Sequence, residues 1–125
     1  MSHVRRVVAV VDDLMVRSRI EAAAPPEVQV SFPRSRAELL AQLDPTPDLI
    51  LVGMAATRQP WADLIRAARE HPSSRGVPVV AFGPHKDLAL REQALAAGAD
   101  RVLANSALMV ELPRLLGGRL DHSYE

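Results

Sequence analysis

The sequence predicts an α/β protein in which helices cover both faces of a parallel sheet, and three observations support this class. Short, strongly apolar runs recur along the chain, as expected for buried strands. Segments of helical composition separate these runs, so that strands and helices alternate. Gly and Pro stand at many of the boundaries between them. We therefore expect five strands and five helices in one domain of 125 residues.

The strands are the most apolar segments of the chain. They are placed at residues 7–11, 28–32, 49–52, 77–82 and 101–104. The first and third runs contain no polar residue, which is typical of strands buried on both faces of a parallel sheet. The second run alternates apolar and polar residues, as an edge strand does. Pro78 must lie near the start of the fourth strand, because proline cannot donate a backbone hydrogen bond.

The helices fill the intervals between the strands. They are placed at residues 14–24, 37–43, 61–71, 86–97 and 106–116. Ser35 and Glu38 form a capping box before the second helix. Gly98 suits the position just beyond the fourth helix. Pro113 conflicts with an unbroken fifth helix, so we expect a late start or a kink there.

Composition excludes several functional classes. Fifteen Lys and Arg balance fifteen Asp and Glu, which argues against a nucleic-acid binder or a polybasic membrane anchor. Aromatic residues make up 3% of the chain, too few for a base-stacking platform. Cysteine is absent, so disulfides and thiolate nucleophiles are excluded. No apolar run approaches the roughly 18 residues of a membrane span and no targeting signal is visible, so a cytoplasmic location is expected.

The positions to inspect for function are those just beyond the carboxyl ends of the predicted strands, where parallel sheets of this kind place their sites. These positions hold Asp12 and Asp13 after the first strand, Gly53 after the third, Gly83 after the fourth and Asn105 after the fifth.

Four motifs in this order carry a family resemblance: VVDD at 10–13, PDLILV at 47–52, VPVVAF at 77–82 and ALAAGAD at 94–100. With them the chain resembles a response-regulator receiver domain of the chemotaxis type over about residues 5–118. The resemblance implies a three-layer, flavodoxin-like fold with strand order 2-1-3-4-5. It also implies a single domain over 1–125 with a polar tail at 119–125, and a role in two-component or phosphorelay signalling.

The chain departs from the receiver pattern at the positions that carry its chemistry. Receivers similar to this chain have a phosphoacceptor Asp, a Thr or Ser, and a Lys where Gly53, Gly83 and Asn105 stand. Glycine has no carboxylate, so no acyl phosphate can form at residue 53. Only Asp12 and Asp13 remain, and they form at best a weak Mg²⁺ site. Their structural alternative is a turn at a helix N-terminus.

Other charged residues could compensate for these losses. Asp48 begins the third predicted strand, at the wrong end of the sheet, and Asp63 lies on the following helix, so neither is expected to replace the missing carboxylate. Arg58 or Lys86 could instead neutralise the acid pair.

We therefore expect a phosphorylation-independent pseudo-receiver that is not an enzyme and requires no cofactor. The resemblance to receiver domains implies that its output would be contact with a protein partner, or self-association, through the fourth helix, fifth strand and fifth helix. Nucleic acid and membrane are not expected as partners. The alternative function is a sensor that binds a small ligand or nucleotide in the vacated phosphorylation pocket.

Three residues are candidates for the interface. Val102 stands where the family has its switch aromatic, and Trp61 is either a binding anchor or a residue of helix packing. Leu88 is predicted by spacing to lie in the core with Leu90 and Leu95. If Leu88 is exposed, the surface around the fourth helix becomes the interface.

Overall fold

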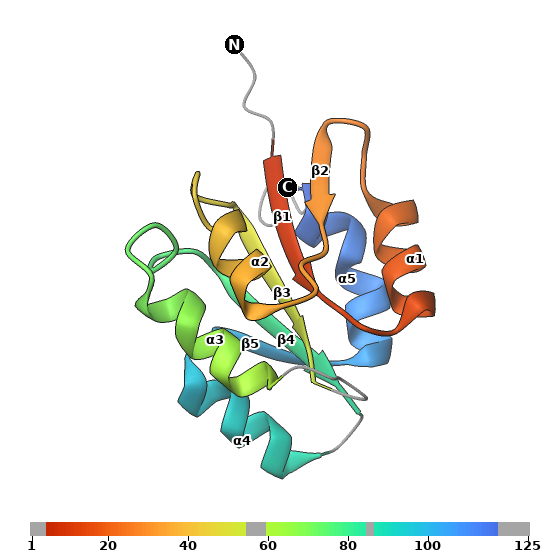
Figure 1. Cartoon of the computed structure of the whole chain (residues 1–125). Coiled ribbons are helices and arrows are strands. Elements are labelled where there is room, and N and C mark those ends of the chain that lie inside the picture. The colour runs from red at the N-terminus through yellow and green to blue at the C-terminus, as the bar shows by residue number, and fades with distance from the viewer. Residues whose placement is uncertain (1–4, 55–59, 85–86, 118–125) are drawn as a thin grey trace, which may run out of the picture.

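A five-stranded sheet forms the centre of the computed structural model, which describes residues 5–54, 60–84 and 87–117. The strands are β1 (Arg5–Val10), β2 (Val28–Ser31), β3 (Leu49–Gly53), β4 (Val79–Gly83) and β5 (Arg101–Ala104). All neighbouring strands are parallel, and their order is β2-β1-β3-β4-β5 (Figure 1). The predicted class and strand order are confirmed.

The five helices form two layers around this sheet. They are α1 (Leu14–Ala23), α2 (Arg36–Gln42), α3 (Trp61–Glu70), α4 (Leu88–Ala97) and α5 (Asn105–Gly117). Helices α1 and α5 cover one face, and α2, α3 and α4 cover the other (Figure 1). No helix among the described residues is long and apolar enough to cross a bilayer.

Each face of the sheet has its own apolar core, because alternate strand residues point to opposite faces. The core beneath α1 and α5 includes Val7, Ala9, Ile20, Leu49, Leu51, Val80, Phe82, Leu108, Leu112 and Leu116. The core beneath α2, α3 and α4 includes Val8, Val10, Leu39, Leu43, Val52, Met54, Leu64, Ile65, Val79, Ala81, Ala94 and Ala97. The three inner strands are buried along almost their whole length, which explains their apolar runs.

Two predicted boundaries at β4 and α4 need correction. Strand β4 begins at Val79 rather than at Val77, whose N–H donates to Ser74 O at 3.0 Å in a turn. Helix α4 begins at Leu88 rather than at residue 86, because the Asp87 carboxylate caps it by accepting the N–H of Leu90 at 3.1 Å.

Helix α5 runs from the end of β5 through Pro113. It begins at Asn105, immediately after Ala104, so the expected late start is wrong. Pro113 lies within the helix on its exposed side, where its missing N–H removes one bond from the helical series.

The turn between α4 and β5 depends on a glycine, as predicted. Gly98 caps α4 with φ of 123°, a left-handed conformation that side-chain-bearing residues rarely adopt. A Cβ at this position would also lie 3.2 Å from Cγ of Arg69. The guanidinium of Arg69 donates to Gly98 O through Nη2 at 2.7 Å, so the glycine lets the α3 side chain approach the turn.

Candidate functional site

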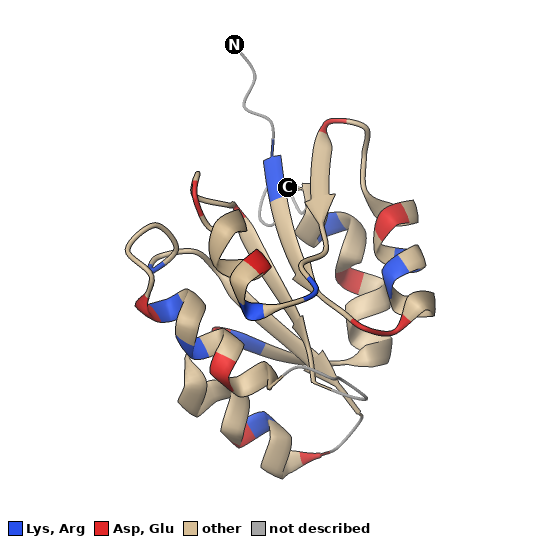
Figure 2. Ribbon diagram, in the orientation of Figure 1, with Lys and Arg blue, Asp and Glu red and all other residues tan. Residues whose placement is uncertain are grey.

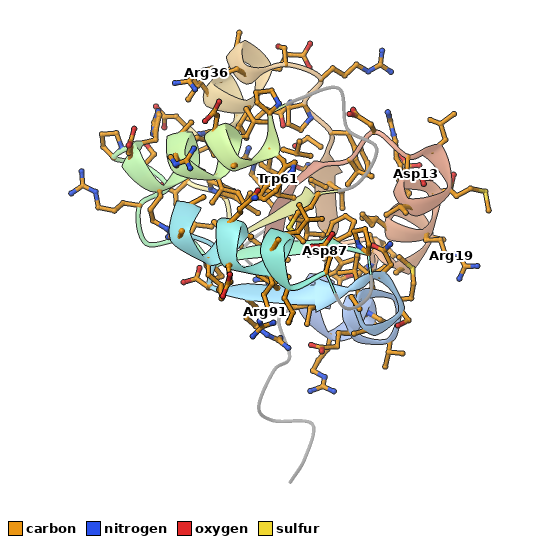
Figure 3. The ribbon with its side chains drawn as sticks, turned by 90° about the horizontal axis from the view of Figure 1, so that it is seen from below. Asp13, Arg19, Arg36, Trp61, Asp87 and Arg91 are labelled. Atoms are coloured by element: carbon orange, nitrogen blue, oxygen red, sulfur yellow. The ribbon has the colours of Figure 1, made fainter. Side chains whose placement is uncertain are left out.

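The predicted site residues lie at one edge of the sheet. The strand registers pair Val10 with Val52, Gly53 with Phe82, and Gly83 with Ala104. The carboxyl ends of four strands therefore lie level, and the residues at or just after these ends are Asp12, Asp13, Gly53, Gly83 and Asn105. Figure 3 shows the molecule from this side.

Gly53 is buried at the end of β3, and an aromatic ring lies where its side chain would begin. A Cβ on Gly53 would be 3.2 Å from Cζ and 3.4 Å from Cε2 of Phe82, and 3.5 Å from the carbonyl oxygen of Val10. Phe82 is 3% exposed and belongs to the core beneath α1 and α5. The Phe82 ring therefore crowds the point at which a phosphoacceptor side chain would begin.

Gly83 has a similar relationship to Met54. A Cβ on Gly83 would lie 3.0 Å from Cε and 3.2 Å from Cβ of Met54. The Met54 N–H donates to Phe82 O at 2.8 Å, which holds the methionine against the end of β4. A side chain at either glycine would therefore meet Phe82 or Met54, and ligand binding in the vacated phosphorylation pocket stays a prediction.

The two residues of the acid pair are both exposed, and one of them caps a helix. Asp13 is the N-cap of α1, and its Oδ1 accepts the N–H groups of Met15 at 2.8 Å and Val16 at 3.2 Å. Asp12 precedes it in the loop and is exposed. The helix-cap alternative for this pair is thus observed at Asp13.

The described residues do not offer a ligand set for a divalent cation. Among residues 5–54, 60–84 and 87–117, no group of three His, Asp or Glu side chains is placed to hold a metal ion. One oxygen of Asp13 already binds the start of α1, and Gly53 supplies no third carboxylate. Of the acidic side chains at this edge, Asp12 and Asp13 remain as the residues that could contact a cation.

The residues considered as substitutes do not reach the site. Asp48 lies at the opposite edge of the sheet, where its Oδ2 accepts the N–H of Arg6 at 2.8 Å. Asp63 is exposed on α3 and pairs with Arg66 at 2.8 Å. Arg58 and Lys86, the expected counter-charges, lie outside the described residues.

A hollow remains beside the acid pair, displaced from the two glycines toward β2. It measures about 550 Å³ and is lined by Val11, Asp12, Asp13, Leu14, Arg17, Phe32, Pro33 and Arg34. The guanidinium carbon of Arg17 lies 4.5 Å from the centre of the Phe32 ring. The hollow therefore presents two acids, two bases and an aromatic surface.

The surface around α4 differs from the predicted core. Leu88 is 71% exposed and Leu95 is 42% exposed, so their assignment to the core is wrong, whereas Leu90 is partly buried. Leu88 and Val102 line a groove of about 360 Å³ between α4 and β5. Trp61 is partly buried at the start of α3 and packs against the core beneath α2, α3 and α4.

Three further residues near these sites were not predicted from the sequence. Phe82 and Met54 crowd the glycine positions, and the register of β3 with β4 brings Phe82 beside Gly53. Arg91 lies on the outer side of α4 and donates to Val102 O at 3.3 Å (Figure 3). Arg91 follows Leu88 by three residues, and this helical spacing could have placed the two side chains on the same side of the helix.

Comparison with solved structures assigns the fold. The response regulator from Hahella chejuensis is similar, with a TM-score of 0.76 and 20% sequence identity over 97% of this chain and 98% of that chain. A response regulator receiver domain protein (CheY-like) from Methanospirillum hungatei JF-1 gives 0.76 and 19% identity over 95% of both chains. The fold is therefore the CheY-like receiver fold, a five-stranded parallel sheet in the order 2-1-3-4-5 with five helices.

A third similar structure contains a metal. The receiver domain of a sensor histidine kinase from Pseudomonas aeruginosa PAO1 has a TM-score of 0.71 and 20% identity over 93% of this chain and 97% of that chain. Its magnesium ion is coordinated in the active site cleft. No protein-family model and no curated protein matches the present chain.

Proposed function

We propose that the chain is a receiver-like module of two-component or phosphorelay signalling that works without phosphorylation and is not an enzyme. Its output is contact between proteins. The CheY-like receiver fold supports the signalling class. The residues at the carboxyl edge of the sheet support independence from phosphate, because Gly53, Gly83 and Asn105 supply neither a phosphoacceptor nor a cation to bind a phosphoryl group.

The contact between Gly53 and Phe82 carries this proposal. A phosphoacceptor needs a carboxylate that reaches solvent at the end of β3, and here the first atom of any side chain meets the Phe82 ring at 3.2 Å. An acceptor side chain at residue 53 would therefore require the Phe82 ring to shift by a few tenths of an ångström.

In this proposal, any Mg²⁺ that the chain binds is bound weakly. Asp12 and Asp13 supply two carboxylates at most, and Asp13 already caps α1. Mg²⁺ prefers six oxygen ligands in near-octahedral geometry, which in phosphorylatable sites include a third carboxylate and phosphate.

The proposed contact surface is the α4-β5-α5 face, defined by Leu88, Arg91 and Leu95 on α4, Arg101 on β5 and Glu111 on α5. Its two leucines, Leu88 and Leu95, are exposed on the same helix, and they offer apolar surface to a partner. Arg101 and Glu111 form a two-bond ion pair, at 2.9 and 3.1 Å, that joins β5 to α5. The face thus combines apolar anchors with a fixed polar rim.

A phosphodonor experiment tests independence from phosphate. The chain is incubated with acetyl phosphate and Mg²⁺, and its intact mass is compared with that of a phosphorylatable receiver treated in parallel. We expect no added phosphoryl group on the chain while the control receiver is modified. An acid-labile phosphoprotein, at Asp12, Asp13 or any other residue, overturns the proposal.

A pull-down tests the contact surface. The unmodified chain is compared with Leu88→Glu and with Leu14→Glu, because Leu14 is a similarly exposed leucine on α1, at 73% against 71% for Leu88. We expect Leu88→Glu alone to lose the bound protein. Equal retention by both variants contradicts the assignment of the α4-β5-α5 face.

The second candidate function is a ligand sensor, and the hollow beside Asp12 and Asp13 favours it. Because Arg17 and Arg34 also line that hollow, it suits a small molecule that carries both a positive and a negative charge. A thermal-shift screen with nucleotides, amino acids and Mg²⁺ distinguishes this function, because a bound ligand raises the unfolding temperature with concentration.

A further inference from the structure

Helices α1 and α5 lie side by side on one face of the sheet, and a groove runs between them (Figure 1). One part of this α1–α5 groove measures about 460 Å³ and is lined by residues of both helices. A second part, of about 350 Å³, shares Met15, Arg19 and Met109 with the first. The two parts therefore adjoin, and each has the roughly 300–1,000 Å³ that is typical of sites for small molecules.

The lining of the α1–α5 groove is mostly apolar. Its main apolar members are Met15, Ala22, Ala23, Met109, Leu112 and Pro113. Methionine side chains are flexible, so they can adapt to an unbranched or irregular apolar ligand. Uncharged polar side chains, Asn105 and Ser106, line the groove at the end where α5 begins. The groove therefore suits a ligand with an apolar body and a polar head.

Arg19 gives the groove its charge. Among the described residues that line the two parts, Arg19 is the one charged side chain, and it lines both. Its neighbours on α1, three and four residues away in each direction, are all apolar: Met15, Val16, Ala22 and Ala23. Arg19 is exposed (Figure 3), and among residues 5–54, 60–84 and 87–117 it takes part in no ion pair. The groove is therefore complementary to an anion.

We propose that the α1–α5 groove binds a small amphipathic carboxylate, such as a fatty acid of medium length. The guanidinium of Arg19 holds the carboxylate, because its paired N–H donors match the two carboxylate oxygens. The apolar chain lies along Met109 toward Leu112 and Pro113. This groove shares no lining residue with the hollow beside Asp12 and Asp13, so the inference goes beyond the proposed function.

The charge of the groove disfavours other occupants. A nucleotide or another polyphosphate carries several negative charges, and one arginine supplies too few cations to match them. A cation or a zwitterion finds no acidic side chain among the described residues of the lining. A second copy of the chain, placed about a two-fold axis at the groove, would bring Arg19 close to its own symmetry mate, and like charges oppose association. A single carboxylate on an apolar body fits best.

Calorimetric titration with octanoate and three related compounds tests the charge and the apolar body separately. We expect octanoate to bind, and acetate, which lacks the apolar chain, to give no measurable binding. Octanol has no charge and octylammonium has the opposite charge, so each should bind about tenfold more weakly than octanoate. Equal binding of octanoate, octanol and octylammonium would show apolar association without recognition of the carboxylate, and would overturn the proposal.

Substitutions at exposed positions test the role of Arg19. Arg19→Gln should raise the dissociation constant for octanoate about tenfold, because the amide carries no charge. The matched control Arg36→Gln removes an exposed arginine from α2, on the other face of the sheet (Figure 3), and should leave the affinity unchanged. Ala22→Glu places a carboxylate three residues from Arg19, where it competes with the ligand, and should also weaken binding; Ala37→Glu, on α2, should not. Unchanged affinity in both Arg19→Gln and Ala22→Glu contradicts the assignment.

Methyl NMR locates the bound ligand, because the chain has four methionines and they report on different places. Met15 and Met109 line the groove, whereas Met54 is 6% exposed and lies beside Gly83 at the end of β4. In a chain with labelled methionine methyl groups, octanoate should shift the signals of Met15 and Met109 and leave that of Met54 in place. A shift confined to Met54 would place the ligand at the glycine positions and overturn the α1–α5 site.

Sedimentation velocity separates a bound carboxylate from a second copy of the chain in the groove. We expect octanoate to bind without changing the mass of the sedimenting species. A dimer that Ala22→Glu dissociates, and that octanoate leaves intact, would mean that a second copy covers the groove, and would overturn the proposal. A chain that binds octanoate in the groove and also accepts a phosphoryl group supports this site and contradicts phosphate independence alone.

Discussion

The carboxylate of Asp100 joins α3 to the start of β4. Its Oδ2 accepts Nη2 of Arg69 at 2.7 Å and the backbone N–H of Val79 at 2.8 Å, and the Asp100 N–H donates to Val79 O at 2.8 Å. Arg69 also donates to the carbonyl oxygens of Gly98 and Val77. One ion pair therefore fixes the end of α3, the turn before β4 and the turn before β5.

Asp100→Ala should lower the free energy of unfolding by about 1–2 kcal/mol, because a buried backbone donor and a guanidinium lose their acceptor together. Denaturant unfolding followed by the fluorescence of Trp61, the chain's one tryptophan, measures the loss. The control is Asp63→Ala, which removes an exposed ion pair of similar length, 2.8 Å, on α3. Asp63→Ala should lower the free energy of unfolding by no more than about 0.5 kcal/mol. Equal losses would contradict the joining role of Asp100.

The apolar runs made the fold predictable from the sequence, whereas the leucines of α4 gave a wrong prediction of the core. Leu88 and Leu95 have helical spacing, but the side of α4 that faces α3 and the sheet is built from Ala94 and Ala97. Small residues allow close packing of helices but contribute little to a hydrophobic pattern in the sequence. The larger leucines dominate the pattern of this segment, so the pattern predicts them in the core. Their exposure became visible only once α4 was positioned on the sheet.

The location of the candidate site was predictable from the sequence, but the side chains that pack beside its glycines were not. The ends of β1, β3, β4 and β5 meet where the sequence placed them. The approach of the Phe82 ring to Gly53 depends on the register of two strands and on rotamers of the core, which no local pattern reports. The absent side chains at Gly53 and Gly83 indicated free space, and no pattern in the sequence indicated that Phe82 and Met54 lie so close to these two positions.

Gly53→Asp should destabilise the protein by about 1–3 kcal/mol, because the new side chain overpacks the core against Phe82. In a chain that also carries Phe82→Leu, which removes the ring, Gly53→Asp should cause a smaller loss of stability. Gly76→Asp is the control, since a Cβ at Gly76 meets no atom within 4 Å. Thermal and denaturant unfolding measure all four variants. Additive effects of the Gly53 and Phe82 changes would show that the two positions do not interact.

Asp13→Ala should cost about 1 kcal/mol of unfolding free energy, because α1 loses the acceptor for its first N–H groups. Asp13→Asn should retain most of the stability, since asparagine also caps helices. Denaturation is measured with and without Mg²⁺. If Asp13→Asn loses as much stability as Asp13→Ala, or if Mg²⁺ stabilises only the natural chain, then a metal role replaces the capping role.

Pro113→Ala should raise the free energy of unfolding by about 1–2 kcal/mol, because alanine restores the N–H that proline removes from α5. Pro26→Ala is the control, since Pro26 is an exposed residue in the turn before β2. There the more flexible unfolded chain should make the variant slightly less stable. A loss of stability in Pro113→Ala would mean that α5 is already bent around the ring and that alanine cannot straighten it.

The outermost strands, β2 and β5, have four residues each, while the strands between them have five or six. Every helix also carries both acidic and basic residues, so no face has a single sign (Figure 2). A foreign strand that approaches either border finds few backbone groups to bind, which discourages fibril growth from the native domain. Native contacts between copies are thereby left to the helices.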